Sequence, residues 1–513
     1  MNAPSPALDL APAVVVLPGG KCALADGAGA RAIEPRAARD LFEGGPVLVV
    51  HAAMTAQRLG LRPPPRAPRL FDALELWAFV RPARFCAPTA AGLAIAAGLP
   101  EPHGAEAQAA ALCEVAALLL AELAARPTPS RDEALAQAET LGRAGWAWAP
   151  AAIRALRSGP LGKPWRGAGL DVWSRLTEWE DEGPPGEPGT NRIDPAAAAD
   201  RLATLLERSG LAEARPTQAA FAAETAYAFQ PRDREGEPRM MLAEAGTGVG
   251  KTLGYLAPAS LWAEANGPAV WISTYTRALQ RQIERESHAV YPDPATRAKK
   301  AVVRKGRENY LCLLNFQDAT NAAQLGNGDY IGLALVSRWA RVSRDGDMTG
   351  GDFPAWLPTL FAVGAAAQAS ASNLVDRRGE CVHAGCPHYR VCFIERAIRA
   401  SRHAELVIAN HALVMTQAAF DGARAARGQK ADVETTQLKR IVFDEGHHLF
   451  DAADAAFAAA LSGVEAAEMR RWIRGPEGRG RRGRGLEARL ADVLADREMA
   501  REARIARSMK QTR

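Results

Sequence analysis

Residues 243–252, with the sequence AEAGTGVGKT, combine glycines, a lysine and a threonine in the spacing that suits a bound phosphate. Glycines allow a tight turn in which several backbone N–H groups point inward at an anion. Lys251 can reach the β- and γ-phosphates of a nucleotide, and the hydroxyl of Thr252 can coordinate Mg²⁺. We interpret the stretch as a phosphate-binding loop, although Ala245 stands where the strict pattern has glycine. The alternative is a glycine-rich turn that ends in Lys-Thr by chance.

The flanking residues predict the strand–turn–helix context that such a loop requires. Met240–Leu242 is a short apolar run that we predict to be a buried strand, and the residues from Leu253 onward predict a helix. The N-terminus of that helix would add a partial positive charge beside the phosphates. The candidate nucleotide-binding residues are Ala245, Gly246, Thr247, Gly248, Val249, Gly250, Lys251, Thr252 and, in the segment that leads to the loop, Gln218.

A second group of reactive side chains follows another apolar run and consists of Asp444, Glu445, Gly446 and His447. An Asp at the carboxyl end of a buried strand is where a nucleotide-binding sheet places its second Mg²⁺ contact. Glu445 can orient and deprotonate the attacking water, and His447 can sense the γ-phosphate. A helix N-terminus with an acidic first turn is the alternative. Because this acidic box follows a phosphate loop in the expected order, we predict an ATPase core whose catalytic residues are Lys251, Asp444, Glu445 and His447.

The segments around these two groups alternate in the pattern of a parallel sheet. Apolar runs that predict strands cover residues 269–274, 301–303, 405–409 and 439–443, and residues 277–288 predict a helix. Nearly continuous apolar strands joined by crossover helices indicate a parallel sheet that is covered on both faces. The predicted fold class is therefore α/β, with a P-loop NTPase sheet.

Four of the seven cysteines fall in one region, at positions 312, 381, 386 and 392. A [4Fe–4S] cluster needs four thiolates, one for each iron, and zinc accepts the same donors. Zinc sites usually come as paired knuckles, which one distant cysteine followed by a C-x₄-C-x₅-C run fits poorly. Buried free thiols are the third interpretation, and the clustering argues against it.

Several of these segments resemble motifs of superfamily-two helicases with a DEAH box. They are the phosphate loop, residues 274–282 (TYTRALQRQ) as motif Ia, and the acidic box as motif II. The cysteine spacing, the lead-in Lys305–Cys312 and the stretch Ala409–Leu413 are similar to the DinG and XPD branch, which carries an iron–sulfur domain between motifs Ia and II. The resemblance covers roughly residues 215–460.

The resemblance implies a RecA-like first motor lobe with ATP, Mg²⁺ and a [4Fe–4S] cluster as cofactors, and single-stranded or forked DNA as partner. The implied cluster ligands are Cys312, Cys381, Cys386 and Cys392, with His383 and His388 as bystanders, and the implied Mg²⁺ ligands are Thr252 and Asp444. Motif Ia of the family touches the single strand, which makes Thr274, Arg277 and Gln280 candidate DNA contacts. An amphipathic helix with a solvated basic face is the alternative for these three.

The N-terminal residues predict a small α/β domain, with strands at 13–17 and 46–50 and a helix at 109–125. The order of His51–Leu59 and Leu70–Leu76 resembles the proofreading-type 3′–5′ exonuclease fold. That family holds two metal ions with carboxylates, but no Asp-x-Glu follows the first strand here, and Thr55 replaces the second-motif Asp. We therefore predict a degenerate domain in which Asp72 is a structural or surface residue. An unrelated α/β domain is the alternative.

The predicted organisation has five parts. Residues 1–125 form the degenerate exonuclease-like domain, 215–304 with 400–450 the first helicase lobe, 305–399 the cluster insert, and 451–513 a basic, helical, arch-like insert. Residues 126–214 are interrupted by Pro and Gly and predict an irregular connecting segment. Its five tryptophans favour packing on a neighbouring domain over stacking on bases.

Composition sets the remaining bounds. The chain has 513 residues, 48% hydrophobic, with a net charge of +5, which is compatible with a polyanionic partner. We find no apolar run of the roughly 18–20 residues that cross a bilayer and no signal peptide. The expectation is a cytoplasmic monomer without membrane contact, whose cysteines are not paired as disulfides.

The second RecA-like lobe of such a helicase is missing from the pattern. No Gln-x-x-Gly-Arg signature and no further parallel-sheet pattern follow residue 450. We expect the chain to be the N-terminal part of a longer ATP-dependent DNA helicase that couples ATP hydrolysis to translocation on single-stranded DNA and duplex unwinding. The alternatives are a nucleotide- and DNA-binding module without turnover and, less favoured, a 3′–5′ exonuclease.

Overall fold

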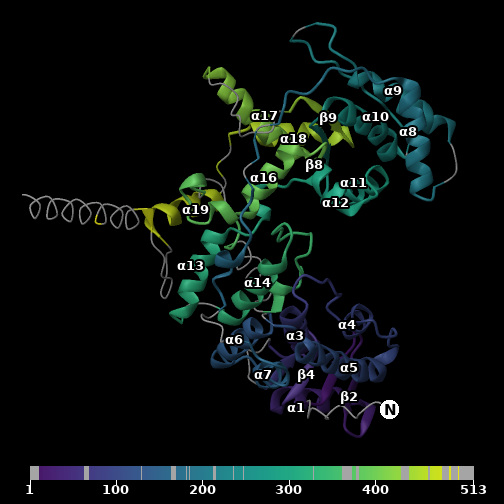
Figure 1. Ribbon diagram of the computed structural model, residues 1–513. Helices are drawn as coiled ribbons and strands as arrows, with labels where there is room; N and C mark the ends of the chain where they lie inside the picture. Colours follow the sequence, from purple (N-terminus) through teal and green to yellow (C-terminus); the bar gives the residue numbers. More distant parts are fainter. Residues whose placement is uncertain are drawn as a thin grey trace, which may run out of the picture.

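The computed structural model describes residues 11–62, 69–128, 130–162, 169–180, 182–183, 185–211, 215–234, 236–246, 248–326, 329–360, 373–376, 381–428, 438–459, 461 and 463–475, and the single positions 485, 486 and 495. The N-terminal elements lie at one end of the molecule and the sheet that contains β8 and β9 at the other (Figure 1). The helices α13 (Leu313–Gln324), α14 (Tyr330–Val342) and α16 (Phe393–His403) lie between the two ends.

The N-terminal domain is built on a five-stranded sheet of order β3-β2-β1-β4-β5. Its strands are β1 (Ala13–Val16), β2 (Cys22–Asp26), β3 (Gly29–Ile33), β4 (Val47–Val49) and β5 (Leu70–Asp72). The first three pair antiparallel, whereas β4 and β5 continue parallel to β1. The two strands predicted from sequence are confirmed as β1 and β4. Alternate residues of these strands face two separate buried clusters, so the sheet is covered on both faces.

Five helices accompany this sheet: α1 (Pro35–Gly44), α2 (Ala52–Arg58), α3 (Ala73–Val80), α4 (Ala90–Ala97) and α5 (Gly104–Ala125). Helix α5 corrects one expectation, because its 22 residues are long and apolar enough to cross a membrane by length and composition alone. Nine of its side chains are buried in the N-terminal domain, including Leu112, Val115 and Leu119. Its apolar character is therefore accounted for by packing in the domain core.

The tryptophan-rich segment packs against the N-terminal domain, as predicted. The indole Nε1 of Trp146 donates to Glu75 Oε2 at 3.0 Å, and that of Trp148 donates to the carbonyl oxygen of Asp72 at 2.8 Å. The segment is not irregular throughout: between its breakers lie the helices α6 (Ser130–Arg143), α7 (Ala149–Arg157) and α8 (Pro195–Arg208). Helix α8 belongs to the core of the second sheet, so the segment is divided between two parts of the molecule.

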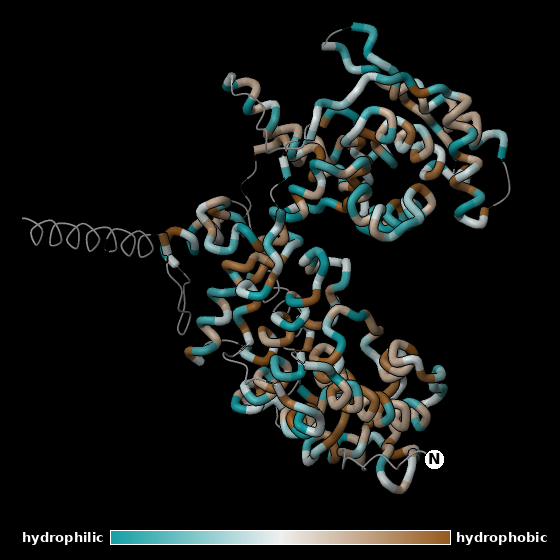
Figure 2. The backbone as a smooth tube through the Cα atoms, in the orientation of Figure 1, coloured by the Kyte–Doolittle hydropathy of each residue, from teal (hydrophilic) through white to brown (hydrophobic). Residues whose placement is uncertain are grey.

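The N-terminal domain and the insert share one cluster of buried hydrophobic residues. Figure 2 shows hydrophobic residues along the chain in both parts. Arg338 of α14 is buried at this junction. Its Nε donates to the carbonyl oxygen of Phe79 at 2.5 Å, its Nη1 donates to Gln137 Oε1, and its guanidinium lies 3.9 Å from the centre of the Phe79 ring. Burial lowers the pKa of Arg338 to about 9. The insert is thus joined to the N-terminal domain by satisfied polar contacts inside an apolar core.

The second sheet is parallel and has the order β7-β8-β6-β9. Its strands are β6 (Val270–Thr274), β7 (Ala301–Val303), β8 (Leu406–Asn410) and β9 (Arg440–Phe443). One face packs on α8, α9 (Pro216–Thr225), α10 (Lys251–Asn266) and α11 (Arg277–Val290), and the other face contacts Val414 of α17 (His411–Ala426). The prediction of a parallel sheet covered on both faces is confirmed.

The predicted strand at Met240–Leu242 is wrong. These residues form no regular structure, and the side chains of Met240 and Leu242 are 74% and 90% exposed. An apolar run becomes a strand only where a neighbouring strand receives its backbone hydrogen bonds. Among the described strands, β9 ends the sheet and pairs only with β6, so no partner reaches this segment.

Beyond the acidic box the chain is helical, as predicted, with α18 (Leu449–Phe457) and α19 (Gly463–Arg474). Helix α18 packs against α17. The arginine- and glycine-rich stretch at 479–484 lies outside the described residues.

We expect Arg338→Ala to lower the free energy of unfolding by about 2–4 kcal/mol, because it leaves buried acceptors without their donor and opens a cavity. Urea denaturation of the full chain measures the change. Arg341→Ala is the matched control, since Arg341 lies on the same helix and is exposed. Equal stabilities of the two variants would contradict the shared core.

Candidate nucleotide-binding site

The phosphate loop runs over the surface into the first turn of α10. Gly248 and Gly250 have φ angles of 82° and 84°, the left-handed region in which glycine is favoured, and Gly250 is the N-cap of α10. Thr247 lies outside the described residues. Gln218, predicted to contact nucleotide, is buried and donates from Nε2 to the carbonyl oxygen of Gly250 at 2.8 Å. Its buried side-chain amide therefore binds the loop backbone from the interior of the protein.

Lys251 and Glu445 are brought together as the sequence predicted. Lys251 Nζ lies 3.1 Å from Glu445 Oε1, although 194 residues separate them. Both side chains are about one third exposed, so the ion pair is open to solvent. A bound γ-phosphate would compete with the Glu445 carboxylate for the lysine, which makes this pair a contact that nucleotide must replace.

Asp444 lies where the carboxyl ends of β9 and β6 meet. Its backbone N–H donates to the carbonyl oxygen of Ser273 at 2.8 Å, and its Oδ2 accepts from the hydroxyl of Thr274 at 3.2 Å. Burial raises the pKa of Asp444, and the hydrogen bond from Thr274 opposes that rise. One carboxylate oxygen of Asp444 thus accepts a bond from the neighbouring strand end, and the predicted role of Asp444 as a Mg²⁺ ligand stays a prediction.

Thr252 faces a carboxylate that sequence reasoning missed. Glu286 of α11 accepts from Gln282 Nε2 at 2.8 Å. Burial raises the pKa of Glu286, and hydrogen bonds from Gln282 and Thr252 oppose the rise. No motif marks this position in the sequence, because its approach to Thr252 depends on how α11 packs against α10.

His447 is exposed and lies beside the Glu445 carboxylate, with its Nδ1 3.6 Å from Glu445 Oε2. Its ring is also 4.1 Å from that of His448, at an interplanar angle of 43°. The residue therefore sits at the acidic box as predicted, and its sensing of a γ-phosphate stays a prediction.

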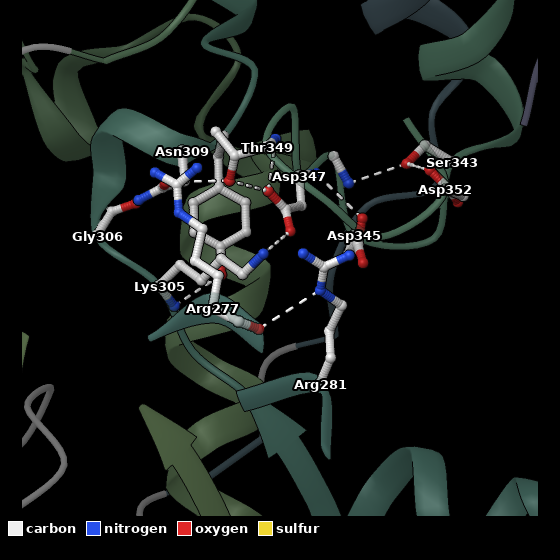
Figure 3. Close-up of polar contacts among 12 residues, drawn as sticks. Arg277, Arg281, Lys305, Gly306, Asn309, Ser343, Asp345, Asp347, Thr349 and Asp352 are labelled. Atoms are coloured by element: carbon white, nitrogen blue, oxygen red, sulfur yellow. Dashed lines mark hydrogen bonds and ion pairs between the residues drawn. The ribbon is translucent and has the colours of Figure 1, made fainter. Parts of the chain in front are cut away.

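The three predicted DNA contacts differ in accessibility. Arg277 is exposed at the start of α11 and donates from Nη2 to Asn309 Oδ1 at 3.1 Å, as Figure 3 shows. Thr274 is fully buried at the end of β6 and Gln280 is 2% exposed on the inner side of α11. A strand of DNA on the surface cannot touch these two buried side chains. The prediction that Thr274 and Gln280 contact DNA through their side chains is therefore corrected. The sequence alone did not give the rotation of α11 that buries Gln280.

Figure 3 also shows that Asn309 joins the lobe to the insert. Its Oδ1 accepts from the hydroxyl of Thr349 at 3.0 Å, in addition to the bond from Arg277. In the same junction Lys305 forms an ion pair with Asp347. Burial raises the pKa of the nearby Asp345 to about 6. Motif Ia is thus connected through one side chain to the loop that follows α14.

The four clustered cysteines line one pocket, together with Asp376, Glu395, His383 and His388. Burial raises the pKa of Cys312 to about 12 and of Cys392 to about 11. Arg307 donates from Nη2 to Cys381 Sγ at 2.7 Å. Within the described part of the chain, no three His, Cys, Asp or Glu side chains are already arranged as a metal site. His388 Nε2 lies 2.7 Å from Gln317 Oε1, an existing partner that suits a bystander.

The residues at the place of the exonuclease motifs serve the fold. Asp72 is buried and accepts from the backbone N–H groups of His51, Ala52 and Leu74, so the prediction of a structural role is confirmed. The hydroxyl of Thr55 donates to the carbonyl oxygen of Val50 at 3.0 Å. These contacts engage the two side chains internally.

His411 is a site residue to which the sequence assigned no role. It is 1% exposed, its Nδ1 lies 2.7 Å from Ser273 Oγ, and its ring lies against Phe443 and the backbone of Asp444 and Glu445. Glu445 has a φ angle of 56°, which is unfavourable for a residue other than glycine. His411 therefore supports the strained backbone that presents Glu445. Two signals were available in the sequence: its position shortly after the predicted strand 405–409, and its place in the family-like stretch Ala409–Leu413.

We expect His411→Leu to lower the free energy of unfolding by about 1–3 kcal/mol, because the buried Ser273 hydroxyl loses its partner. The same change should weaken binding of Mg-ATP, since Glu445 loses its support. Denaturation and nucleotide titration of the full chain measure both. His411→Gln keeps a polar partner for Ser273 and should restore much of each loss; if His411→Leu binds Mg-ATP as tightly as the parent chain, the supporting role is wrong.

The chain is similar in sequence to proteins named as helicases and to one named as an exonuclease. No protein-family model matches it. The chain is 31% identical over 233 residues to the ATP-dependent DNA helicase YoaA of Escherichia coli (strain K12), which is 44% of this chain and 32% of that protein. It is 29% identical over 267 residues to the ATP-dependent helicase DinG of Mycobacterium tuberculosis (strain H37Rv), which is 48% of this chain and 36% of that protein.

It is also 29% identical over 253 residues to the 3'-5' exonuclease DinG of Bacillus subtilis (strain 168), which is 49% of this chain and 24% of that protein. The matched stretch therefore spans between 24% and 36% of the length of these three relatives. By sequence similarity over nearly half of its length, the chain is a relative of the DinG-like ATP-dependent DNA helicases.

Proposed function

We propose that this chain is the first motor lobe of an ATP-dependent DNA helicase, which couples ATP hydrolysis to movement along single-stranded DNA and to duplex unwinding. The observation that carries the proposal is the meeting of Lys251 with Glu445, beside Asp444, at the carboxyl edge of a parallel sheet. The names of the relatives supply the DNA substrate.

The residues have the following roles in this proposal. Lys251 and the backbone N–H groups of the loop hold the phosphates, and Thr252 and Asp444 would hold Mg²⁺, which neutralises phosphate charge when bound. Glu445 orients the attacking water and accepts its proton. Lys251 forms an ion pair with this carboxylate. Phosphate binding would take the lysine away and leave Glu445 free to act as a base.

The cysteine pocket fits a [4Fe–4S] cluster by its donors. Four thiols line a single pocket, and Arg307 supplies a positive charge beside Cys381. Burial holds Cys312 and Cys392 in the protonated form, so cluster binding would displace protons from them. Cys312 precedes α13 and Cys392 precedes α16, so a bound cluster would tie the starts of these two helices together.

The N-terminal domain is proposed to be an exonuclease-like domain without nuclease activity. The support is the internal engagement of Thr55 and Asp72, which leaves neither group directed at a metal ion. Its role in this proposal is to carry the insert, with which it shares a core.

We expect the full chain to bind ATP with Mg²⁺ and to hydrolyse it faster with single-stranded DNA, and Lys251→Ala to reduce hydrolysis by about 10²-fold. Steady-state ATPase assays with and without oligo(dT) measure this. Lys299→Ala is the control, because Lys299 is an exposed lysine of α12 (Pro294–Lys300) away from the loop. An unchanged rate of ATP hydrolysis in Lys251→Ala would contradict the assignment of residues 243–252 as the phosphate loop of an ATPase. ATP binding without any turnover would favour the alternative of a nucleotide- and DNA-binding module.

We expect anaerobic reconstitution with iron and sulfide to give about four irons for each chain and a visible thiolate-to-iron absorption band. Cys392→Ser should abolish both, whereas Cys113→Ser should not, because Cys113 lies in the N-terminal domain outside the pocket. Metal analysis of the purified chain provides a second readout. Stoichiometric zinc without iron would refute the iron–sulfur assignment.

A further inference from the structure

The loop that follows β6 is stacked on the acidic box by an aromatic pair. The ring of Tyr275 lies 3.9 Å from the ring of His448, with an interplanar angle of only 13°. Tyr275 begins the loop between β6 and α11, and His448 ends the short 3₁₀ turn (Gly446–His448) after the acidic box. The stack therefore joins the motif Ia loop to the segment that carries the catalytic carboxylate.

A second contact beside the stack fixes the same two segments. Thr274, the residue before Tyr275, donates from its hydroxyl to Asp444 Oδ2. The backbone of Ser273 accepts from the N–H of Asp444 at 2.8 Å. These contacts tie the end of β6 to the acidic box.

The contacts continue from the stack to the phosphate loop. The ring of His448 lies 4.1 Å from that of His447, and His447 Nδ1 lies 3.6 Å from Glu445 Oε2. The other oxygen of Glu445 is paired with Lys251 Nζ at 3.1 Å. Described side chains therefore form an unbroken series of contacts from Tyr275 to the lysine of the phosphate loop.

The outer side of the same loop suits a nucleic acid. Tyr275 is 47% exposed despite its stack, and Arg277 is exposed two residues later. An accessible aromatic ring beside a cation is the combination that binds single strands, because bases stack on the ring and the cation attracts the phosphates. Thr274 and Gln280 are buried, so Tyr275 is the loop residue best placed to meet a base.

We propose that Tyr275 stacks on a base of single-stranded DNA with its open side and that its contact with His448 couples the DNA site to the ATP site. This rests on the proposed function. A base on the exposed side fixes the Tyr275 ring and with it His448, His447 and Glu445. Nucleotide binding requires the same residues to be placed, so the first ligand orders what the second needs and each ligand tightens the binding of the other.

The test is a pair of titrations on the full chain. A fluorescent, non-hydrolysable ATP analogue is titrated with Mg²⁺ in the absence and presence of saturating oligo(dT), and the ratio of the two dissociation constants is the coupling factor. We expect a ratio above one in the parent chain, and a fall of about two- to twelvefold in Tyr275→Leu, the factor to which one aromatic stack corresponds.

Three further variants locate the effect. Tyr275→Phe keeps the ring and should keep the coupling factor, whereas His448→Ala should lower it without weakening oligo(dT) binding measured in the absence of nucleotide. Phe85→Leu removes an exposed aromatic ring of the N-terminal domain and should change neither ligand. Analogue binding without DNA shows that each variant is folded.

The outcomes separate this proposal from the proposed function. A ratio of one or less in the parent chain, or an unchanged ratio in both Tyr275→Leu and His448→Ala, overturns the coupling while leaving ATP binding intact. A parent chain that binds no ATP analogue overturns the proposed function itself. Loss of coupling in Tyr275→Leu and His448→Ala with retention in Tyr275→Phe and Phe85→Leu supports the proposal.

Discussion

Parallel pairing of β6 with both β8 and β9 is the constraint on which the site depends. Thr274 is in register with Asn410, and Ser273 with Phe443, so three strands end at one level. Parallel strands point the same way, and the residues after their carboxyl ends must therefore converge. This convergence gives Thr274 its bond to Asp444 across 170 residues of sequence, and it places His411 under the acidic box.

The same geometry explains how the backbone of Glu445 can be held under strain. Glu445 adopts a left-handed backbone that a side chain resists, at a cost of order 1–3 kcal/mol. The bond from the Asp444 N–H to the carbonyl oxygen of Ser273 and the contact of the Ser273 hydroxyl with His411 are buried, where hydrogen bonds are electrostatically stronger than in water. The carboxyl edge of the sheet supports the Glu445 backbone because polar side chains at the ends of otherwise apolar strands lie close together there.

Sequence patterns predicted the parts of the fold that depend on local periodicity. The strands β6 to β9 and helix α11 follow from apolar runs and a helical repeat, and the phosphate loop and acidic box follow from residue type and order. The predicted strand at Met240–Leu242 was wrong because a strand needs a partner strand, which no local pattern reveals. The predicted DNA contact of Gln280 was wrong because packing decides which side of α11 is buried. The approach of Glu286 to Thr252 was missed for the same reason. His411 carries no motif chemistry of its own, so its role is visible only once β8 is placed beside β6.

The N-terminal domain shows how the fold can hold buried polar residues by giving each of them partners. Asp72 caps two helix starts, and the carbonyl oxygen of the same residue receives the indole of Trp148. His51 Nε2 lies 2.9 Å from the hydroxyl of Thr359 in the insert. A buried carboxylate or imidazole is costly unless such partners are present, and burial raises the pKa of Asp72 and lowers that of His51. These side chains join three segments of the chain, so the N-terminal domain can hold the cysteine-bearing insert in place.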